Sequence, residues 1–399
     1  MDDITWGVAA AATQAEGAAP ASDWRAWEAE GRVPYSSDGN GFATNYRQDL
    51  RLFSEAGFSA VRLTIDWARI EPIVDVVDDR AVDHYRDVLS SAVGAGLTPW
   101  LVLVDGSLPG WFSIDERGFR EQRARSYYWP RHAERCAELF GTWAAAWIPI
   151  LRPLRLARRA YFSASAPPGL HHPERFALTL EGLYLGLGDA WRALRGGPPV
   201  VAAFDVAVVH PADREVTTRG EARRGNELLW SWTSLFRDGE TSIPRLGPAA
   251  SPIMRDAFDL VGLTIEQRIT VDEQGKWWRS PHAADVAELL HRAGEEASER
   301  PLAVLGQTVA NPDEAEEVPA LVEAAAAEGV PVRAWFHEPA IDGYEGIQGF
   351  DAELGLWDRD RNPKAILHPI AARAAASRVR FEPDWSTAVS LEPPRRTAG

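Results

Sequence analysis

The chain has 399 residues, of which 25% are charged and 45% hydrophobic, the balance of an ordinary globular protein. Its formal net charge of −16 argues against nucleic acid or an anionic membrane surface as a partner, because both need a basic footprint. The length allows two domains or one barrel-sized domain.

Short apolar runs recur along the chain and alternate with segments of helical periodicity. The runs are Thr5–Ala9, Ala60–Ile65, Pro99–Val104, Ala146–Leu151, Val200–Ala207, Leu260–Thr264, Leu302–Leu305 and Val332–Phe336. Helices are expected within Tyr46–Ala56, Asp83–Ala95, Pro173–Leu194, Ala283–Ala293 and Glu314–Glu328. Buried strands alternating with helices predict a parallel sheet, and eight strands close an α/β TIM barrel, the (β/α)8 fold.

One domain is expected over residues 1–380, because no low-complexity linker divides the chain. Residues 381–399 lack periodicity and are predicted to form a loose tail. Cys136 is the single cysteine; it stands in a helical pattern and is interpreted as a small buried apolar residue. The start lacks the basic region of a signal peptide and no apolar run is long enough to span a membrane, so a cytoplasmic location is expected.

Function in such a barrel is expected where the strands end, because the loops after the strands form its mouth. The residues at those positions are Glu16, Trp67, Asp105, Arg152, Gly306 and the segment 337–345. The chain contains no phosphate-binding glycine motif and no metal-ligand spacing, so neither cofactor nor metal is predicted. The pair Trp277-Trp278 lies in a predicted loop or hairpin; binding surface and packing remain equally open for it.

Several ordered segments resemble family 1 glycoside hydrolases, which include β-glucosidases. Residues 6–17 are similar to the family pattern W-G-x-A-T-A-A-x-Q-x-E-G. Residues 62–72 are similar to the family pattern R-F-S-I-S-W-x-R-I-x-P. Shorter matches occur at 108–109, 258–262, 335–337, 342–345 and 355–356. The resemblance covers nearly the whole chain and implies the TIM barrel with a sugar site at its mouth. By this resemblance and their strand-end positions, the expected substrate-binding residues are Gln14, Glu16, Arg62, Trp67, Glu266, His337 and Glu345.

The chain departs from the family at both catalytic positions. The acid/base glutamate of W-x-T-L-N-E-P aligns with Arg152, and the nucleophile of T-E-N-G aligns with Gly306. Retaining glycosidases need two carboxyl groups about 5 Å apart. Arginine stays charged at physiological pH and glycine offers no nucleophile, so retaining glycoside hydrolysis is not expected.

Three functions therefore stay open. The first is a repurposed pocket for a sugar-like or other polar small molecule, possibly anionic; the second is a non-catalytic binding or scaffold role. The third is an atypical β-glycosidase or transglycosylase that uses substitute carboxylates. The residues expected to carry any new chemistry are Asp105 and Glu338 as acid and base, with Arg152 beside them and His337 as an orienting group. The oligomeric state is not predicted.

The charge of the ligand follows from the same substitutions. By the resemblance, Arg62 faces the nucleophile, so a glycine at residue 306 leaves this arginine without its carboxylate while Arg152 adds a second guanidinium. Two arginines around a vacated space favour a carboxylate or phosphate docking between them. The alternative is internal neutralisation, in which Arg152 pairs with Glu345, Asp105 or Glu338.

Overall fold

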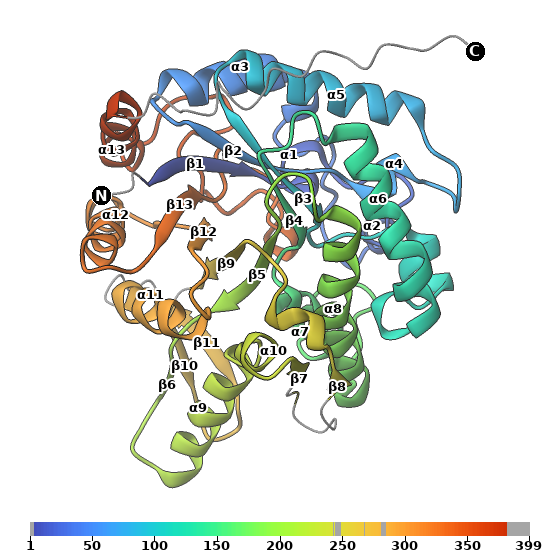
Figure 1. Cartoon of the computed structure of the whole chain (residues 1–399), viewed down its shortest axis with the longest axis vertical. Helices are drawn as coiled ribbons and strands as arrows, with labels where there is room; N and C mark the ends of the chain where they lie inside the picture. Colours follow the sequence, from blue (N-terminus) through green and yellow to red (C-terminus); the bar gives the residue numbers. More distant parts are fainter. Residues whose placement is uncertain (1–3, 242, 244–248, 267, 281–284, 381–399) are drawn as a thin grey trace.

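The structure is a computed structural model that describes residues 4–241, 243, 249–266, 268–280 and 285–380. Its main sheet has eight parallel strands in the order β4-β3-β2-β1-β13-β12-β9-β5. These strands are β1 Thr5–Ala10, β2 Ala60–Thr64, β3 Thr98–Val104, β4 Ala146–Ile150, β5 Val201–Val206, β9 Leu260–Ile265, β12 Leu302–Gln307 and β13 Val332–His337. A parallel bridge between Trp147 and Val200 joins β4 to β5. The predicted TIM barrel is confirmed, because all eight apolar runs are strands of one ring (Figure 1).

The helices form an outer layer around this ring (Figure 1). The larger ones are α3 Phe42–Glu55, α5 Asp79–Gly94, α6 Trp129–Phe140, α8 Pro173–Leu194, α11 Asp285–Glu296, α12 Pro312–Ala327 and α13 Leu367–Arg380. All five predicted helices are present, although residues 283–284 and the predicted tail 381–399 lie outside the described residues. Side-chain caps explain two of the starts, since Asp78 caps α5 and Asn311 caps α12.

Shorter elements fill the connections. The helices are α1 Ala12–Glu16, α2 Asp23–Ala29, α4 Trp67–Ile70, α7 Pro153–Tyr161, α9 Val216–Leu229 and α10 Thr233–Arg237, with single turns at Trp111–Asp115, Gly118–Arg120, Ala124–Tyr128, Pro252–Arg255 and Gly346–Gln348. The small strands are β6 Val209–Pro211, β7 Glu240–Thr241, β8 Ala249–Ala250, β10 Arg268–Val271 and β11 Trp277–Ser280.

The barrel interior is packed with apolar side chains below the mouth. Leu305 and Phe336 are fully buried there, together with valines and alanines of the neighbouring strands. Glycines make room for the two large side chains: a Cβ at Gly7 would lie 2.4 Å from the Phe336 ring, and one at Gly262 would lie 2.4 Å from Leu305. The interior is therefore a closed core, and the space that could hold a ligand lies above it.

Strands β6, β10 and β11 form a small sheet that extends from the barrel beside α9 (Figure 1). Strands β10 and β11 pair antiparallel, which confirms the predicted hairpin. The two tryptophans differ: the Arg158 guanidinium lies 3.9 Å from the ring of Trp277, while Trp278 is 42% exposed. The contact with α7 therefore explains why a tryptophan stands at residue 277. The structure offers no explanation for the exposed tryptophan at residue 278.

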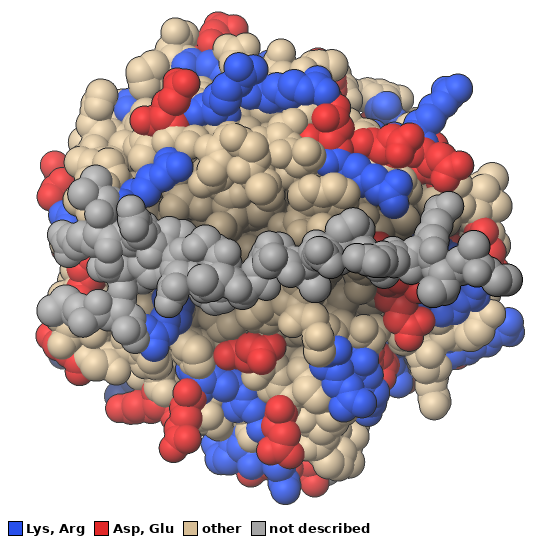
Figure 2. Space-filling view, turned by 45° about the horizontal axis from the view of Figure 1, so that its top comes forward, with Lys and Arg blue, Asp and Glu red and all other residues tan. Residues whose placement is uncertain are grey.

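The described surface shows no single dominant charge on the face of Figure 2, where acidic and basic side chains are mixed. No helix within the described ranges combines the length and the apolar composition needed to cross a bilayer. Cys136 is buried in α6, as predicted, and burial raises the pKa of its thiol.

Candidate functional site

A cavity of about 790 Å³ opens at the carboxyl ends of the barrel strands. Six expected site residues line it together: Gln14, Asp105, Arg152, Glu266, Glu338 and Glu345. They come from the segments that follow β1, β3, β4, β9 and β13. The prediction that the site lies at the barrel mouth, with Arg152 and Gly306 at the ends of β4 and β12, agrees with this geometry.

Glu338 forms ion pairs with two arginines at the floor of this cavity. Its Oε1 lies 2.9 Å from Nη2 of Arg62, and its Oε2 is paired with Nη2 of Arg152. Arg62 also donates a hydrogen bond from Nη1 to the Leu305 carbonyl oxygen. Burial lowers the pKa of both Arg62 and Arg152 to about 10, so both remain cations at neutral pH. The three side chains form a buried cation–anion–cation triad.

Gly306 lies against this triad. A Cβ at Gly306 would be 2.4 Å from Oε2 of Glu338, and 3.1 Å from a guanidinium nitrogen of both Arg62 and Arg152. The Glu338 carboxylate thus fills the space into which a side chain at residue 306 would project. The expectation of an external anion between Arg62 and Arg152 is wrong for this structure, because Glu338 occupies that place. Internal neutralisation is what occurs, through Glu338 rather than Asp105 or Glu345.

Arg152 reaches the triad through an unusual backbone conformation. Its φ of 56° and ψ of 55° are left-handed, which costs a residue with a side chain roughly 1–2 kcal/mol. The conformation turns the chain directly from the end of β4 into α7, whose first residue is Pro153. Asp205 of β5 supports this turn, since its Oδ2 accepts a hydrogen bond of 3.0 Å from the Arg155 backbone N–H. Sequence reasoning did not identify Asp205.

Helix α7 adds two further arginines to the wall of the cavity. Arg155 lies 3.4 Å from Oε1 of Glu266. Burial lowers the pKa of Arg155, but the nearby Glu266 and Asp205 outweigh it and the net shift is upward. Arg159 is bonded to the Ser165 carbonyl oxygen at 3.3 Å, and burial followed by the charge of Arg155 lowers its pKa to about 10. The sequence signal for both was their spacing: Arg155 and Arg159 are four residues apart, which places them on one face of α7, close behind Arg152.

Gln14 and Glu345 form a second polar pair in the cavity, with a hydrogen bond of 2.6 Å from Nε2 of the glutamine to Oε1 of the glutamate. Burial raises the pKa of Glu345. Asp105 stands apart from this pair and accepts a hydrogen bond of 3.4 Å from the Thr64 hydroxyl. Asp105 and the Gln14–Glu345 pair therefore line the same cavity as separate polar groups.

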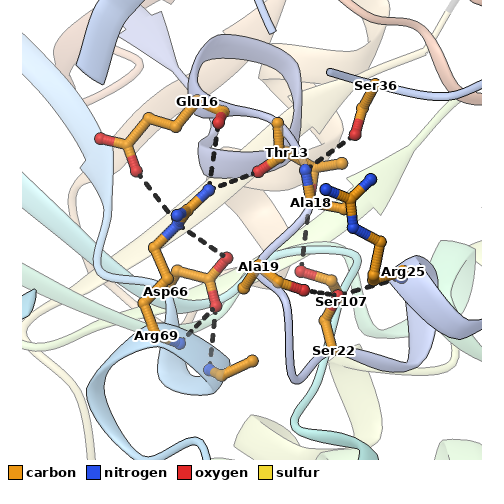
Figure 3. A network of polar contacts seen from close by, with 12 residues as sticks. Thr13, Glu16, Ala18, Ala19, Ser22, Arg25, Ser36, Asp66, Arg69 and Ser107 are labelled. Carbon is orange, nitrogen blue, oxygen red and sulfur yellow. Dashed lines mark hydrogen bonds and ion pairs between the residues drawn. The ribbon is translucent and has the colours of Figure 1, made fainter. Parts of the chain in front are cut away.

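Four expected binding residues, Glu16, Arg62, Trp67 and His337, do not line the cavity, which corrects the prediction that they contact a ligand directly. Glu16 is buried and points away from the cavity. It pairs with Arg69 at 3.5 Å and accepts a hydrogen bond from the Tyr85 hydroxyl at 3.0 Å. Figure 3 shows Arg69 between Glu16 and Asp66. Trp67 is buried and stacks on the ring of His132, with centroids 4.4 Å apart.

His337 is another of these residues. It is fully buried, its Nδ1 lies 3.0 Å from the Pro339 carbonyl oxygen, and its Nε2 accepts a hydrogen bond of 3.4 Å from Val309. Burial lowers the pKa of His337 to about 4, so the ring is neutral. Both ring nitrogens are directed to backbone groups, which corrects the prediction that His337 orients Asp105 or Glu338. Arg62 also lies behind the lining, because Glu338 separates it from the open space.

The cavity has an aromatic wall from α2. Trp24 and Trp27 line it with ring centroids 6.1 Å apart, and Asp23 lies beside them. Within the described ranges, no group of three or more His, Cys, Asp and Glu side chains is arranged to hold a metal ion.

Asp23 makes the stability of this wall sensitive to pH. Burial raises the pKa of Asp23 from 3.8 to about 7, although its Oδ1 accepts a hydrogen bond of 3.0 Å from the Leu108 backbone N–H. The folded state therefore holds this proton more tightly than the unfolded state, and the stability it contributes is present below pH 4 and lost as the pH rises through 7. We expect Asp23→Asn to flatten the fall in melting temperature across this range. An unchanged slope in the variant would contradict the assignment.

Known proteins match the chain over part of its sequence. The model of the family "Glycosyl hydrolase family 1" matches residues 1–234, more than half of the chain. Rice beta-glucosidase 34 is 27% identical over 193 residues, 46% of this chain and 36% of the relative. The 6-phospho-beta-glucosidase of Bacillus subtilis is 29% identical over 163 residues, 38% of this chain and 35% of the relative. The chain thus spans about a third of the length of these two relatives.

Solved structures match over nearly the full length. The beta-glycosidase from Pyrococcus horikoshii superposes with a TM-score of 0.85 at 21% identity and covers 94% of each chain. The family 1 beta-glucosidase from Thermotoga maritima gives a TM-score of 0.83 at 17% identity, with 93% of this chain and 98% of that chain covered. At these identities the structural likeness establishes the fold.

Proposed function

The chain belongs to glycosyl hydrolase family 1, and we propose that its barrel mouth binds a sugar-like or other polar small molecule without retaining glycoside hydrolysis. The observation that carries this proposal is the position of Glu338, held between Arg62 and Arg152 against Gly306. In the proposal, Arg152 and Gly306 stand where the family has its acid/base and nucleophile glutamates. A cytoplasmic location is part of the same proposal.

The triad explains why double displacement would fail. The reaction needs one carboxylate that attacks the anomeric carbon and one carboxylic acid that protonates the leaving oxygen. Glu338 has a carboxylate near the first position, but each of its oxygens is paired with a guanidinium, and these cations stabilise its charge and lower its nucleophilicity. Arg152 is a poor replacement for the acid, because its pKa of about 10 lies well above neutral pH and its pairing with Glu338 further favours the protonated form.

The rest of the cavity supports binding. Its volume of about 790 Å³ lies within the range of small-molecule sites. It combines the polar pair of Gln14 and Glu345 with a wall that contains Trp24 and Trp27, which suits a ligand that has both hydroxyl groups and apolar surface. A pocket that had lost its ligand and was filled by its own side chains would leave no such space.

The alternative of an atypical glycosidase is less well supported. It needs Asp105 and Glu338 as a working acid and base, and Glu338 would first have to leave two buried ion pairs. Removing a buried charge from its partners costs several kcal/mol, and this cost would add to the activation free energy of the hydrolysis. The relatives are named beta-glucosidase and 6-phospho-beta-glucosidase, which supports a ligand of about the shape of a glucoside for the pocket in this proposal.

We expect no covalent glycosyl–enzyme when the protein is incubated with 2,4-dinitrophenyl 2-deoxy-2-fluoro-β-glucoside. The reagent carries a leaving group that needs no protonation, so it reports on the nucleophile alone. Intact-mass spectrometry measures the adduct, with a hydrolytic β-glucosidase of the same family as the positive control. A stoichiometric mass increase in this protein would overturn the proposal; binding of unmodified glucosides measured by calorimetry would support it.

A further inference from the structure

We propose that the ligand carries an anionic group, a carboxylate or a phosphate, which binds to Arg159 on the wall of the cavity. The inference rests on the proposed function, because it names the chemistry of the ligand in the same cavity. It differs from anion binding between Arg62 and Arg152, where Glu338 already supplies the negative charge.

Helix α7 and the residue before it turn three arginines to the cavity. Arg155 and Arg159 are four residues apart on one side of α7, Arg152 directly precedes the helix, and all three line the cavity. Like charges at this spacing repel one another. Two of the three have a carboxylate partner: Arg152 pairs with Glu338, which it shares with Arg62, and Arg155 pairs with Glu266.

Arg159 has no such partner. Within the described part of the chain no carboxylate lies within ion-pair distance of it; its contacts are the Ser165 carbonyl oxygen at 3.3 Å and the Trp24 ring at 5.5 Å. Glu345 is the acid that acts on it most strongly, but that carboxylate is bonded to Gln14 instead. A largely buried cation without a counterion is unfavourable, and an anion from the ligand would supply what the chain lacks.

The surroundings of Arg159 hold its guanidinium at the cavity wall. A Cβ at Gly346 would lie 3.1 Å from Nη2 of Arg159 and 3.5 Å from the Trp24 ring, so the glycine leaves room for both groups. Arg120 and Arg175 line the same cavity, and within the described ranges neither has an ion pair with a carboxylate. These unpaired cations occur in a chain whose net charge is −16, which makes the positive wall a local feature.

Matched sugars test the inference. Isothermal calorimetry at constant ionic strength would compare glucose with glucuronate and glucose 6-phosphate. We expect at least one of the anionic sugars to bind about tenfold or more tightly than glucose, because a guanidinium–anion contact is a charge-assisted pair. Tighter binding of glucuronate would indicate a carboxylate ligand, and tighter binding of glucose 6-phosphate a phosphate ligand. Added salt should weaken the binding of the anionic sugar more than the binding of glucose.

The variants Arg159→Gln and Arg159→Lys assign the effect to this side chain. We expect Arg159→Gln to reduce the affinity for the anionic sugar to that for glucose while leaving the melting temperature of the free protein equal or higher, because it removes an uncompensated cation. Arg159→Lys keeps the charge and should keep part of the preference. Arg158→Gln is the matched control on the same helix; Arg158 lies outside the cavity lining and should not affect either affinity.

The outcomes separate this inference from the proposed function. Equal affinity for glucose and both anionic sugars would overturn the inference and leave the proposed function standing. An anionic preference that persists undiminished in Arg159→Gln would also overturn it. If none of the three sugars binds, the proposed function fails, and the assignment of its ligand fails with it.

Discussion

Replacement of Glu338 with Gln is expected to destabilise the protein by about 3–5 kcal/mol, the usual cost of removing one partner from a buried ion pair. The variant keeps the size of the side chain and removes its charge. It leaves Arg62, which is 1% exposed, and Arg152, which is 11% exposed, as two neighbouring cations without a counterion. Chemical denaturation monitored by tryptophan fluorescence measures the change.

Glu323→Gln is the control for this experiment. Glu323 pairs with Arg373 on the outer layer and is 45% exposed, so its loss should change the stability by less than about 1 kcal/mol. Arg152→Met should fall between the two, because Glu338 then still has Arg62 as its partner. A loss of stability in Glu338→Gln no larger than that in Glu323→Gln would show that the triad does not hold the barrel mouth together.

Much of the fold could be predicted because the physical signal is local. A strand buried on both faces must be apolar along its whole length, and eight such runs are visible between Thr5 and His337. The ends of these runs then locate the barrel mouth, which is why Asp105, Arg152 and Glu338 were found together. The helix starts were less certain, because caps such as Asp78 depend on single residues.

The direction of individual side chains could not be predicted in the same way. Glu16 follows β1 in a motif that the family uses at its site, yet its carboxylate turns outward to Arg69 and Tyr85. Three acids were possible partners for Arg152, and their sequence positions do not distinguish them; the left-handed backbone of Arg152 helps to direct it to Glu338. Asp205 was missed because its role depends on the neighbouring turn.

Gly306 and Glu338 are expected to be coupled, because their side chains compete for one space. A carboxylate introduced by Gly306→Glu alone would meet Oε2 of Glu338, which lies 2.4 Å from the position of the new Cβ. We expect this single variant to lose stability through both overlap and charge repulsion. In Gly306→Glu/Glu338→Ala the new carboxylate can take over the pairs with Arg62 and Arg152, so the double variant should be more stable than either single variant.

The same double variant is expected to gain a nucleophile. Its new glutamate would stand near the end of β12, facing the cavity, where the proposed function places the family's nucleophile. Incubation with 2,4-dinitrophenyl 2-deoxy-2-fluoro-β-glucoside should then give a covalent adduct by intact mass, while the wild type and Glu338→Ala give none. Turnover of glucosides with poor leaving groups should stay absent, because the proposed function leaves no acid at residue 152. A double variant that folds as stably as the wild type but forms no adduct would show that residue 306 does not face the anomeric carbon of a bound sugar.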